Sequence, residues 1–101
     1  MKGIKLQPFT AHGRTVEIYY VPIPDEEGTV TRGLAVKEKG LYRIFINSAI
    51  SLILQKHTLG HELAHVFCGH LDTENPDRAA QEKEADQKAW DYLDAYTHGK
   101  L

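Results

Sequence analysis

The 101-residue chain has a single cysteine, Cys68, and a net charge of only −2. One cysteine excludes an internal disulfide, as is typical of proteins in a reducing cytoplasm. No apolar run is long enough to cross a membrane, and residues 1–5 lack the apolar core of a signal peptide. Without an excess of positive charge, nothing favours nucleic-acid binding. We therefore expect a cytoplasmic protein that contacts neither membrane nor nucleic acid.

The remaining composition is that of an ordinary globular protein, with 42% hydrophobic and 26% charged residues. A chain of this length can build one modest hydrophobic core. It contains no internal repeat, no low-complexity tract and no linker long enough to divide it. We expect a single domain over residues 1–101, and the sequence does not predict its oligomeric state.

One pentad carries most of the chemistry: His61-Glu62-Leu63-Ala64-His65. On a helix, residues four apart lie on one face, so His61 and His65 can direct two imidazole nitrogens at one divalent ion. Glu62 starts from a neighbouring direction and would reach a water molecule at that ion. This H-E-x-x-H pattern predicts zinc ligands at His61 and His65 and a general base at Glu62. The competing interpretation is an amphipathic helix that carries these residues by chance.

The residues around the pentad favour the metal interpretation. Ser51 is suited to cap a helix that runs from about Leu52 to Cys68, and Gly69 stands where a C-terminal glycine belongs. Apolar residues at helical spacing form a buried stripe beside the histidines: Leu52, Leu59, Leu63, Val66 and Phe67. A capped helix with one apolar face is the setting that a metal site in a cleft requires.

The first half of the chain has the alternating pattern of β-strands. It predicts strands over residues 15–21, 30–37 and 41–47, with Gly33 as a bulge or a close approach and a turn at 38–40. Residues 4–9 would add either a further strand or a docked arm. We expect an α+β fold, with a small antiparallel sheet of about three strands followed by two helices, as in a minimal zincin-like domain. An edge strand would also let an extended peptide lie beside the metal.

A site with two histidines requires a third protein ligand. A second helix is predicted from Asn75, as its cap, and Pro76 to about Thr97. At about 100° per residue, Glu82 falls on the apolar face of this helix. Glu84 falls roughly 200° away, on the polar face, where we expect it in solvent. Glu82 is therefore the predicted third ligand, because a carboxylate on an apolar stripe needs a partner.

Four other residues receive roles from the sequence. Asp86 lies one turn after Glu82 and is placed to accept a hydrogen bond from the free ring nitrogen of a ligating histidine. His70 follows Gly69 and could touch the site, but a role as a cap of the turn or as a surface residue is favoured over it. Cys68 is expected to be a small buried apolar group, and His57 a cleft residue. The sequence identifies no secure oxyanion donor; Tyr92, Tyr96 and His70 are the candidates.

Four segments together resemble the ImmA/IrrE family of metallopeptidases: residues 44–48, 55–65, 69–70 and 82–86. The resemblance extends over residues 42–89. It implies a gluzincin-like site with one zinc ion per chain, His61, His65 and Glu82 as ligands and Glu62 as the base. It also implies a role in mobile elements, such as a prophage, or in stress regulation, where such peptidases cut helix-turn-helix repressors.

Two classes of function follow. The first is a zinc endopeptidase that acts on a protein substrate, such as one of these repressors. The second is a zinc-bound interaction module, phage- or plasmid-borne, that binds a protein without cutting it. A zinc site kept only for stability is less favoured, since structural sites normally have four protein ligands. The presence of all four catalytic-site residues favours the enzyme.

Overall fold

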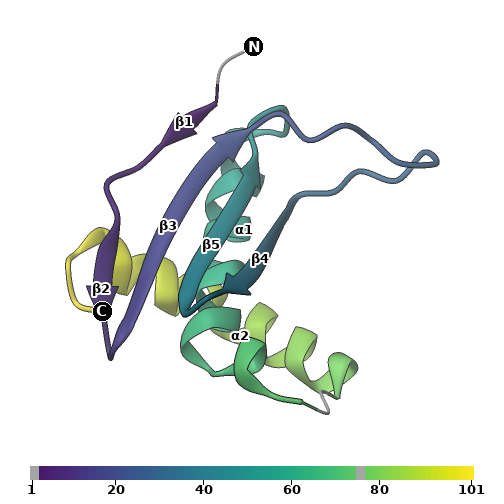
Figure 1. Ribbon diagram of the computed structural model, residues 1–101. Coiled ribbons are helices and arrows are strands. Elements are labelled where there is room, and N and C mark those ends of the chain that lie inside the picture. Colours follow the sequence, from purple (N-terminus) through teal and green to yellow (C-terminus); the bar gives the residue numbers. More distant parts are fainter. Residues whose placement is uncertain (1–2, 75–76) are drawn as a thin grey trace.

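The computed structural model describes residues 3–74 and 77–101. Five strands come first: β1 (Ile4–Lys5), β2 (Phe9–Ala11), β3 (Arg14–Val21), β4 (Gly33–Glu38) and β5 (Leu41–Asn47). They are followed by helix α1 (Leu52–Phe67), the short 3-10 turn η1 (His70–Asp72) and helix α2 (Arg78–Thr97) (Figure 1). The predicted α+β class is confirmed, with two more strands than the sequence suggested.

The strands form one mixed sheet in the order β1-β3-β5-β4, with β2 also paired to β3. The prediction of a purely antiparallel sheet is wrong, because β3 and β5 run parallel. Residues 22–32 carry the chain past the place that β5 will fill, so that β4 begins on its far side. A tight turn at Lys39 and Gly40, both with positive φ (54° and 80°), then reverses the chain. As a result, β5 lies between β3 and β4.

Both alternatives for the N-terminal segment hold in part. The segment forms two short strands, β1 and β2, which pair antiparallel with β3. Phe9 of β2 also docks on the helical layer, since its ring centroid lies 5.1 Å from that of Tyr96 and 6.2 Å from that of Phe67.

The core lies between one face of the sheet and α1. Alternate residues of β3 and β5 point to this face and are buried, among them Ile18, Ile44 and Ile46. They pack against the apolar stripe of α1, including the fully buried Leu63. Helix α1 contacts the sheet on one side and α2 on another. The pentad is therefore carried on the central element of the fold.

The ends of α1 match the prediction. The Ser51 side chain accepts a hydrogen bond from the Leu54 backbone N–H, and Gly69 has a φ of 77° just after the helix. Helix α2 begins at Arg78 and is capped by Asp77, whose side chain accepts from Ala80. The predicted cap at Asn75 and the proline after it lie outside the described residues.

Asn47 closes the long connection between β3 and β4. Its side chain is buried, and its amide donates to the carbonyl of Thr31 at 2.9 Å. Its oxygen accepts from the backbone N–H groups of Ile23 and Ala49 at 3.2 and 2.9 Å. One side chain thus ties both ends of the connection to the end of β5 and fixes where β4 begins.

The helices approach most closely at Gly60. A Cβ atom on Gly60 would lie 1.9 Å from the carbonyl oxygen of Ala89 in α2. Ala89 and Ala85 are themselves fully buried. Small residues on both helices therefore set the spacing between His61, the neighbour of Gly60, and the carboxylates of α2. A second close approach occurs at Gly33, where a Cβ would meet Thr58 of α1 at 2.6 Å.

Gly60→Ala is expected to destabilise the protein although alanine is the better helix former. The added methyl group meets backbone, which cannot move aside as a side chain can, so α2 must shift. We expect a loss of about 2–3 kcal/mol and a fall in Tm of roughly 8–20 °C, measured by thermal melts. Lys56→Ala, on the exposed face of α1, is the control and should change little. An unchanged or higher Tm for Gly60→Ala would contradict the close packing.

Candidate metal centre

His61 and His65 present their rings from one face of α1, as the pentad predicts. Their side chains are 16% and 12% exposed. The two Nε2 atoms lie 3.0 Å apart. Burial lowers the pKa of His65, which favours its neutral, ligand-competent form. The helix thus brings two imidazole nitrogens to one point.

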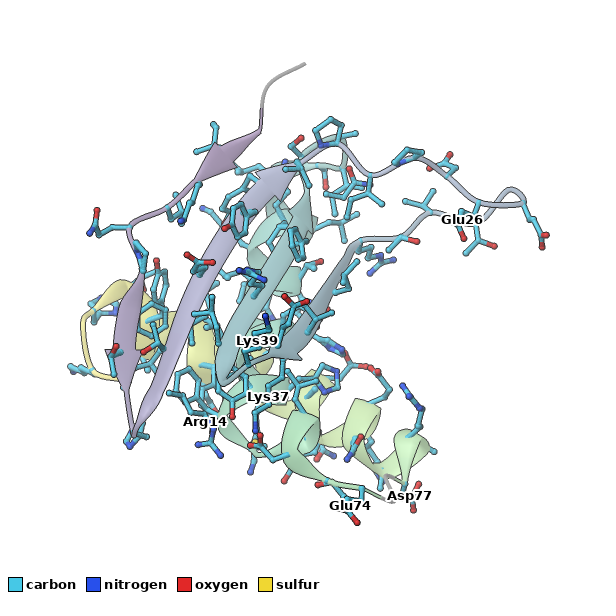
Figure 2. The ribbon with its side chains drawn as sticks, viewed as in Figure 1. Arg14, Glu26, Lys37, Lys39, Glu74 and Asp77 are labelled. Carbon is cyan, nitrogen blue, oxygen red and sulfur yellow. The ribbon has the colours of Figure 1, made fainter. Side chains whose placement is uncertain are left out.

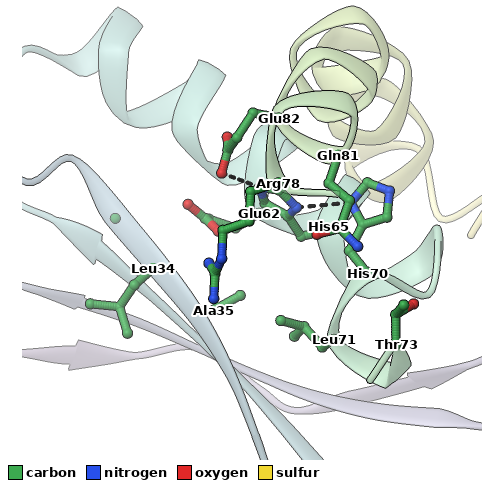
Figure 3. A pocket seen from close by; sticks show the side chains of 11 residues that line it. Leu34, Ala35, Glu62, His65, His70, Leu71, Thr73, Arg78, Gln81 and Glu82 are labelled. Atoms are coloured by element: carbon green, nitrogen blue, oxygen red, sulfur yellow. Dashed lines mark hydrogen bonds and ion pairs between the residues drawn. The ribbon is translucent and has the colours of Figure 1, made fainter. Parts of the chain in front are cut away.

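Glu82 of α2 faces the same point. One carboxylate oxygen lies 2.8 Å from His61 Nε2. The other lies 3.4 Å from His65 Nε2, and Figure 3 shows this contact. The prediction that Glu82 is directed into the core is wrong in one respect, because its side chain is 60% exposed. Ala85 and Ala89 fill the buried part of that stripe, and Glu82 extends it beyond the core into the mouth of a cleft.

Asp86 lies one turn after Glu82 and contacts the other nitrogen of His61. The distance from its Oδ1 to His61 Nδ1 is 2.7 Å. An ionised carboxylate only accepts hydrogen bonds, so Nδ1 carries a proton and donates it to Asp86, which leaves the Nε2 lone pair for a cation when one is bound. This contact turns the lone pair of His61 toward His65 and Glu82.

The structure corrects the predictions for His70 and Glu84. The His70 side chain is only 7% exposed, and its Nδ1 lies 2.9 Å from Nδ1 of His65. Its Nε2 lies 2.5 Å from one carboxylate oxygen of Glu84, and the other oxygen of Glu84 contacts Lys88. His70 is therefore not a surface residue, and Glu84, although 41% exposed, is paired with His70 and Lys88. The position of Glu84 on a helical wheel of α2 could not show its contact with His70. That contact arises because the chain turns back after Gly69, so that η1 brings His70 against Glu84.

Glu62 lies beside the three converging groups and is 7% exposed. The pKa of Glu62 is raised to about 7, chiefly by burial; His61 opposes the rise and the neighbouring Glu82 adds to it. A buried carboxyl group of this kind can both accept and return a proton near neutral pH. Its position suits a general base that works within the cleft.

The donor set suits a divalent cation. Ligand atoms of His61, His65 and Glu82 lie within 4.8 Å of one another. Two imidazole lone pairs and a carboxylate repel one another unless a cation or a shared proton lies between them. Neutral imidazole and carboxylate are zinc ligands, and three of them leave a fourth position open. In a second group, formed by Cys68, His70 and Glu84, the ligand atoms also lie within 4.8 Å of one another.

Two clefts meet at these residues. A larger cleft of about 390 Å³ extends past His65, His70 and Arg78 along β4 (Figure 3). A smaller one of about 240 Å³ extends past His57, His61 and Asp86. Both are lined by Gly33, Glu62 and Glu82. The candidate centre therefore lies where the two clefts join, and together the clefts form a longer groove along the start of β4.

A comparison with protein families decides the assignment. The peptidase M78 family model, described as the IrrE N-terminal-like domain, matches residues 13–93. The matched segment includes the whole pentad and Glu82, Glu84 and Asp86 of α2. The chain belongs to this family. The comparisons with curated proteins and with solved structures gave no match.

Membership of this metallopeptidase family confirms the resemblance seen in the sequence. The family acts on proteins, so a protein substrate is the expected partner. Among the described residues, no helix is both long enough and apolar enough to span a membrane.

Asp72 anchors η1, and with it His70, to the sheet. It accepts hydrogen bonds from Lys37 at 2.7 Å, Tyr42 at 2.8 Å and Arg14 at 3.1 Å. Arg14 and Lys37 lie at the same end of the sheet, although one comes from β3 and the other from β4 (Figure 2). Hydrogen bonds from Lys37, Tyr42 and Arg14 lower the pKa of Asp72 from 3.8 to about 2, against the opposing effect of burial.

These contacts predict a pH-dependent contribution to stability. Because the pKa of Asp72 is lowered on folding, its contribution is complete above pH 3.8 and is lost as the pH falls toward 2. In the metal-free protein, Asp72→Asn should lower the free energy of unfolding by about 1–2 kcal/mol at pH 6. The difference from the parent should shrink by pH 2.5, as measured by urea unfolding. Asp25→Asn, on the exposed connection, is the control; a constant difference for Asp72→Asn would contradict the prediction.

The sequence missed two residues of this region, Asn47 and Asp72, and it ranked a contact of His70 with the site below a cap or surface role. Asn47 ends a strand next to an Ile, but only the three-dimensional path shows that it bridges the connection. The signal for His70 was its place just after a glycine with helix-ending character, which allows the chain to turn back over α1.

Proposed function

We propose that the protein is a zinc-dependent endopeptidase, with one zinc ion per chain held by His61, His65 and Glu82 and with Glu62 as the general base. The observation that carries the proposal is the convergence of both Nε2 atoms and the Glu82 carboxylate beside the buried Glu62. Family membership supports the same reaction class. Asp86 would hold the ring of His61 in its ligating orientation.

The chemistry divides between the cation and the chain. Zinc, when bound, would polarise the scissile carbonyl and acidify a water molecule. Glu62 would accept the proton of the attacking water and pass it to the leaving amine. Its burial suits this role, because a carboxyl group with a raised pKa can return the proton it has taken.

The substrate would lie along β4. Among the described residues, this strand pairs only with β5, so its other edge is open. The backbone N–H of Asn47 donates a hydrogen bond to the carbonyl of Arg32. In an antiparallel pair only every second residue of a strand bonds to the neighbouring strand. The backbone groups of Gly33 and Ala35 therefore point to the open edge. Both residues line the larger cleft with Glu62. An extended peptide added there would cross the junction of the two clefts.

A helix-turn-helix repressor of a mobile element or stress response is the proposed substrate. The support is the resemblance to ImmA/IrrE proteins together with the family match, and the cleft adds the capacity to hold an extended segment. The residues of the repressor that are cut would have to leave their helices, because the edge of β4 accepts only an extended backbone.

Metal titration and a cleavage assay test the proposal together. The metal-free protein should bind one zinc ion by native mass spectrometry. His61→Ala, His65→Ala and Glu82→Ala should each lose it, whereas Asp91→Asn, an exposed carboxylate of α2, should not. The zinc-loaded protein should cut the repressor encoded beside its gene. Zinc binding and repressor binding without cleavage would instead identify the non-cleaving interaction module.

A further inference from the structure

A chain of side chains leads from the polar face of α2 to the inner face of α1. Glu84 contacts Nε2 of His70, and Nδ1 of His70 contacts Nδ1 of His65 at 2.9 Å. His70 is 7% exposed and His65 12% exposed, so water has little access to the contact between them, whereas Glu84 at the outer end is 41% exposed. Lys88 contacts the second oxygen of Glu84 at 3.1 Å. The chain ends at the nitrogen of His65 that faces away from Glu82.

Proton positions along this chain follow from the carboxylate at its end. Glu84 only accepts, so Nε2 of His70 donates to it. A neutral His70 then has a bare Nδ1, which must accept from Nδ1–H of His65. A neutral His65 with its proton on Nδ1 keeps the lone pair on Nε2, the atom that lies 3.0 Å from Nε2 of His61. Each proton position is set by the preceding one, starting from Glu84.

We propose that Glu84 and His70 are positioning residues, which hold His65 in the tautomer and orientation that direct its Nε2 lone pair at the metal site. They do for His65 what Asp86 does for His61, except that a second imidazole lies between the carboxylate and the ligand. The two histidines of the pentad thereby depend on two carboxylates of α2, Glu84 and Asp86, placed on either side of Ala85. This inference rests on the proposed function, because His65 is taken as a ligand.

The same contacts speak against the neighbouring group of Cys68, His70 and Glu84 as a second zinc site. A neutral His70 bound to a cation through Nε2 would carry its proton on Nδ1. That proton would face the Nδ1–H of His65, with two donors 2.9 Å apart. The ammonium group of Lys88 next to Glu84 also opposes a cation there. A metal ion bound by His61, His65 and Glu82 therefore disfavours a second ion at Cys68, His70 and Glu84.

The first test reads the tautomers directly, in metal-free protein, by long-range 1H–15N NMR of the histidine rings. We expect the proton on Nδ1 in His65 and on Nε2 in His70. Glu84→Ala should mix the tautomers of His65 and leave His61 unchanged. Asp86→Ala should have the reverse effect, so each variant is the control for the other. A parent His65 with its proton on Nε2 would overturn the proposal.

The second test measures zinc affinity by competition with a chelating dye. His70→Phe and Glu84→Ala should each weaken binding about 10- to 100-fold. His70→Gln should restore part of the loss, because its amide can accept from His65 and donate to Glu84. Asp91→Asn should bind as the parent does. Parent-like affinity in both His70→Phe and Glu84→Ala would overturn the proposal.

The stoichiometry gives a further decisive outcome. Two zinc ions per parent chain, falling to one in Cys68→Ala, would make His70 a ligand of a second site and would overturn the positioning role. If the parent binds no zinc at all, the proposed function fails, yet the metal-free NMR spectrum still decides which nitrogen of His65 carries the proton. The two failures are therefore distinguishable.

Discussion

Glu62→Gln is expected to lower peptidase activity about 100- to 10,000-fold while zinc binding and folding are retained. The amide has nearly the same shape as the carboxyl group, so the buried site keeps its packing. It cannot accept the proton of the attacking water, so the step assigned to Glu62 fails. The measurement is the rate of repressor cleavage by zinc-loaded protein, with zinc content determined on the same samples.

Two outcomes would contradict this role. A Gln variant that cuts at the parent rate would show that Glu62 is not the base. A variant that loses its zinc would show that Glu62 is a ligand. Glu26→Gln, on the exposed connection between β3 and β4, is the matched control and should leave both rate and zinc content unchanged.

Chelation is expected to lower the stability of the zinc-loaded protein by about 3 kcal/mol when free zinc stands near 100 times its Kd. For a chain of this size the Tm should fall by roughly 10–20 °C. The reason is that zinc would bind only the folded arrangement, in which His61 and His65 of α1 meet Glu82 of α2. Thermal melts with and without a chelator measure the shift, and Glu82→Ala should show none.

Hydrogen exchange should locate this loosening. The second half of α2 has contacts of its own, since Ala89 packs on Gly60 and Tyr92 stacks on Phe67. The first half, residues 78–86, carries the carboxylates that face the histidines. Chelation should therefore expose residues 78–86 first, leave 89–93 more protected and affect the sheet least. Equal protection of 78–86 in both states would mean that the helices pack independently of the metal.

The local elements of this fold were predictable because their signals are local. Alternation marked β3 and β5, and Ser51 and Gly69 marked the ends of α1 within a residue. The order of the strands was not predictable in this way. The residues of β3 and β5 do not indicate that β4 lies at the edge of the sheet, next to β5. That position depends on the path of residues 22–32.

The candidate site divides along the same line. The spacing of His61 and His65 is a property of one helix and could be predicted without a neighbour. The environment of Glu84 could not, because it depends on His70, which a left-handed Gly69 and the anchor at Asp72 bring back over α2. The wheel also placed Glu82 on the correct face but could not show that this end of α2 lies in an open cleft.

A crystal structure of the zinc-loaded protein, with the ion located by anomalous scattering, tests the central claim most directly. We expect one zinc ion per chain, with Nε2 of His61 and of His65 and a carboxylate oxygen of Glu82 at about 2.0–2.2 Å. Glu62 should lie beside the ion without binding it. A zinc ion held by Cys68, His70 and Glu84, with His61 and His65 unligated, would contradict the account.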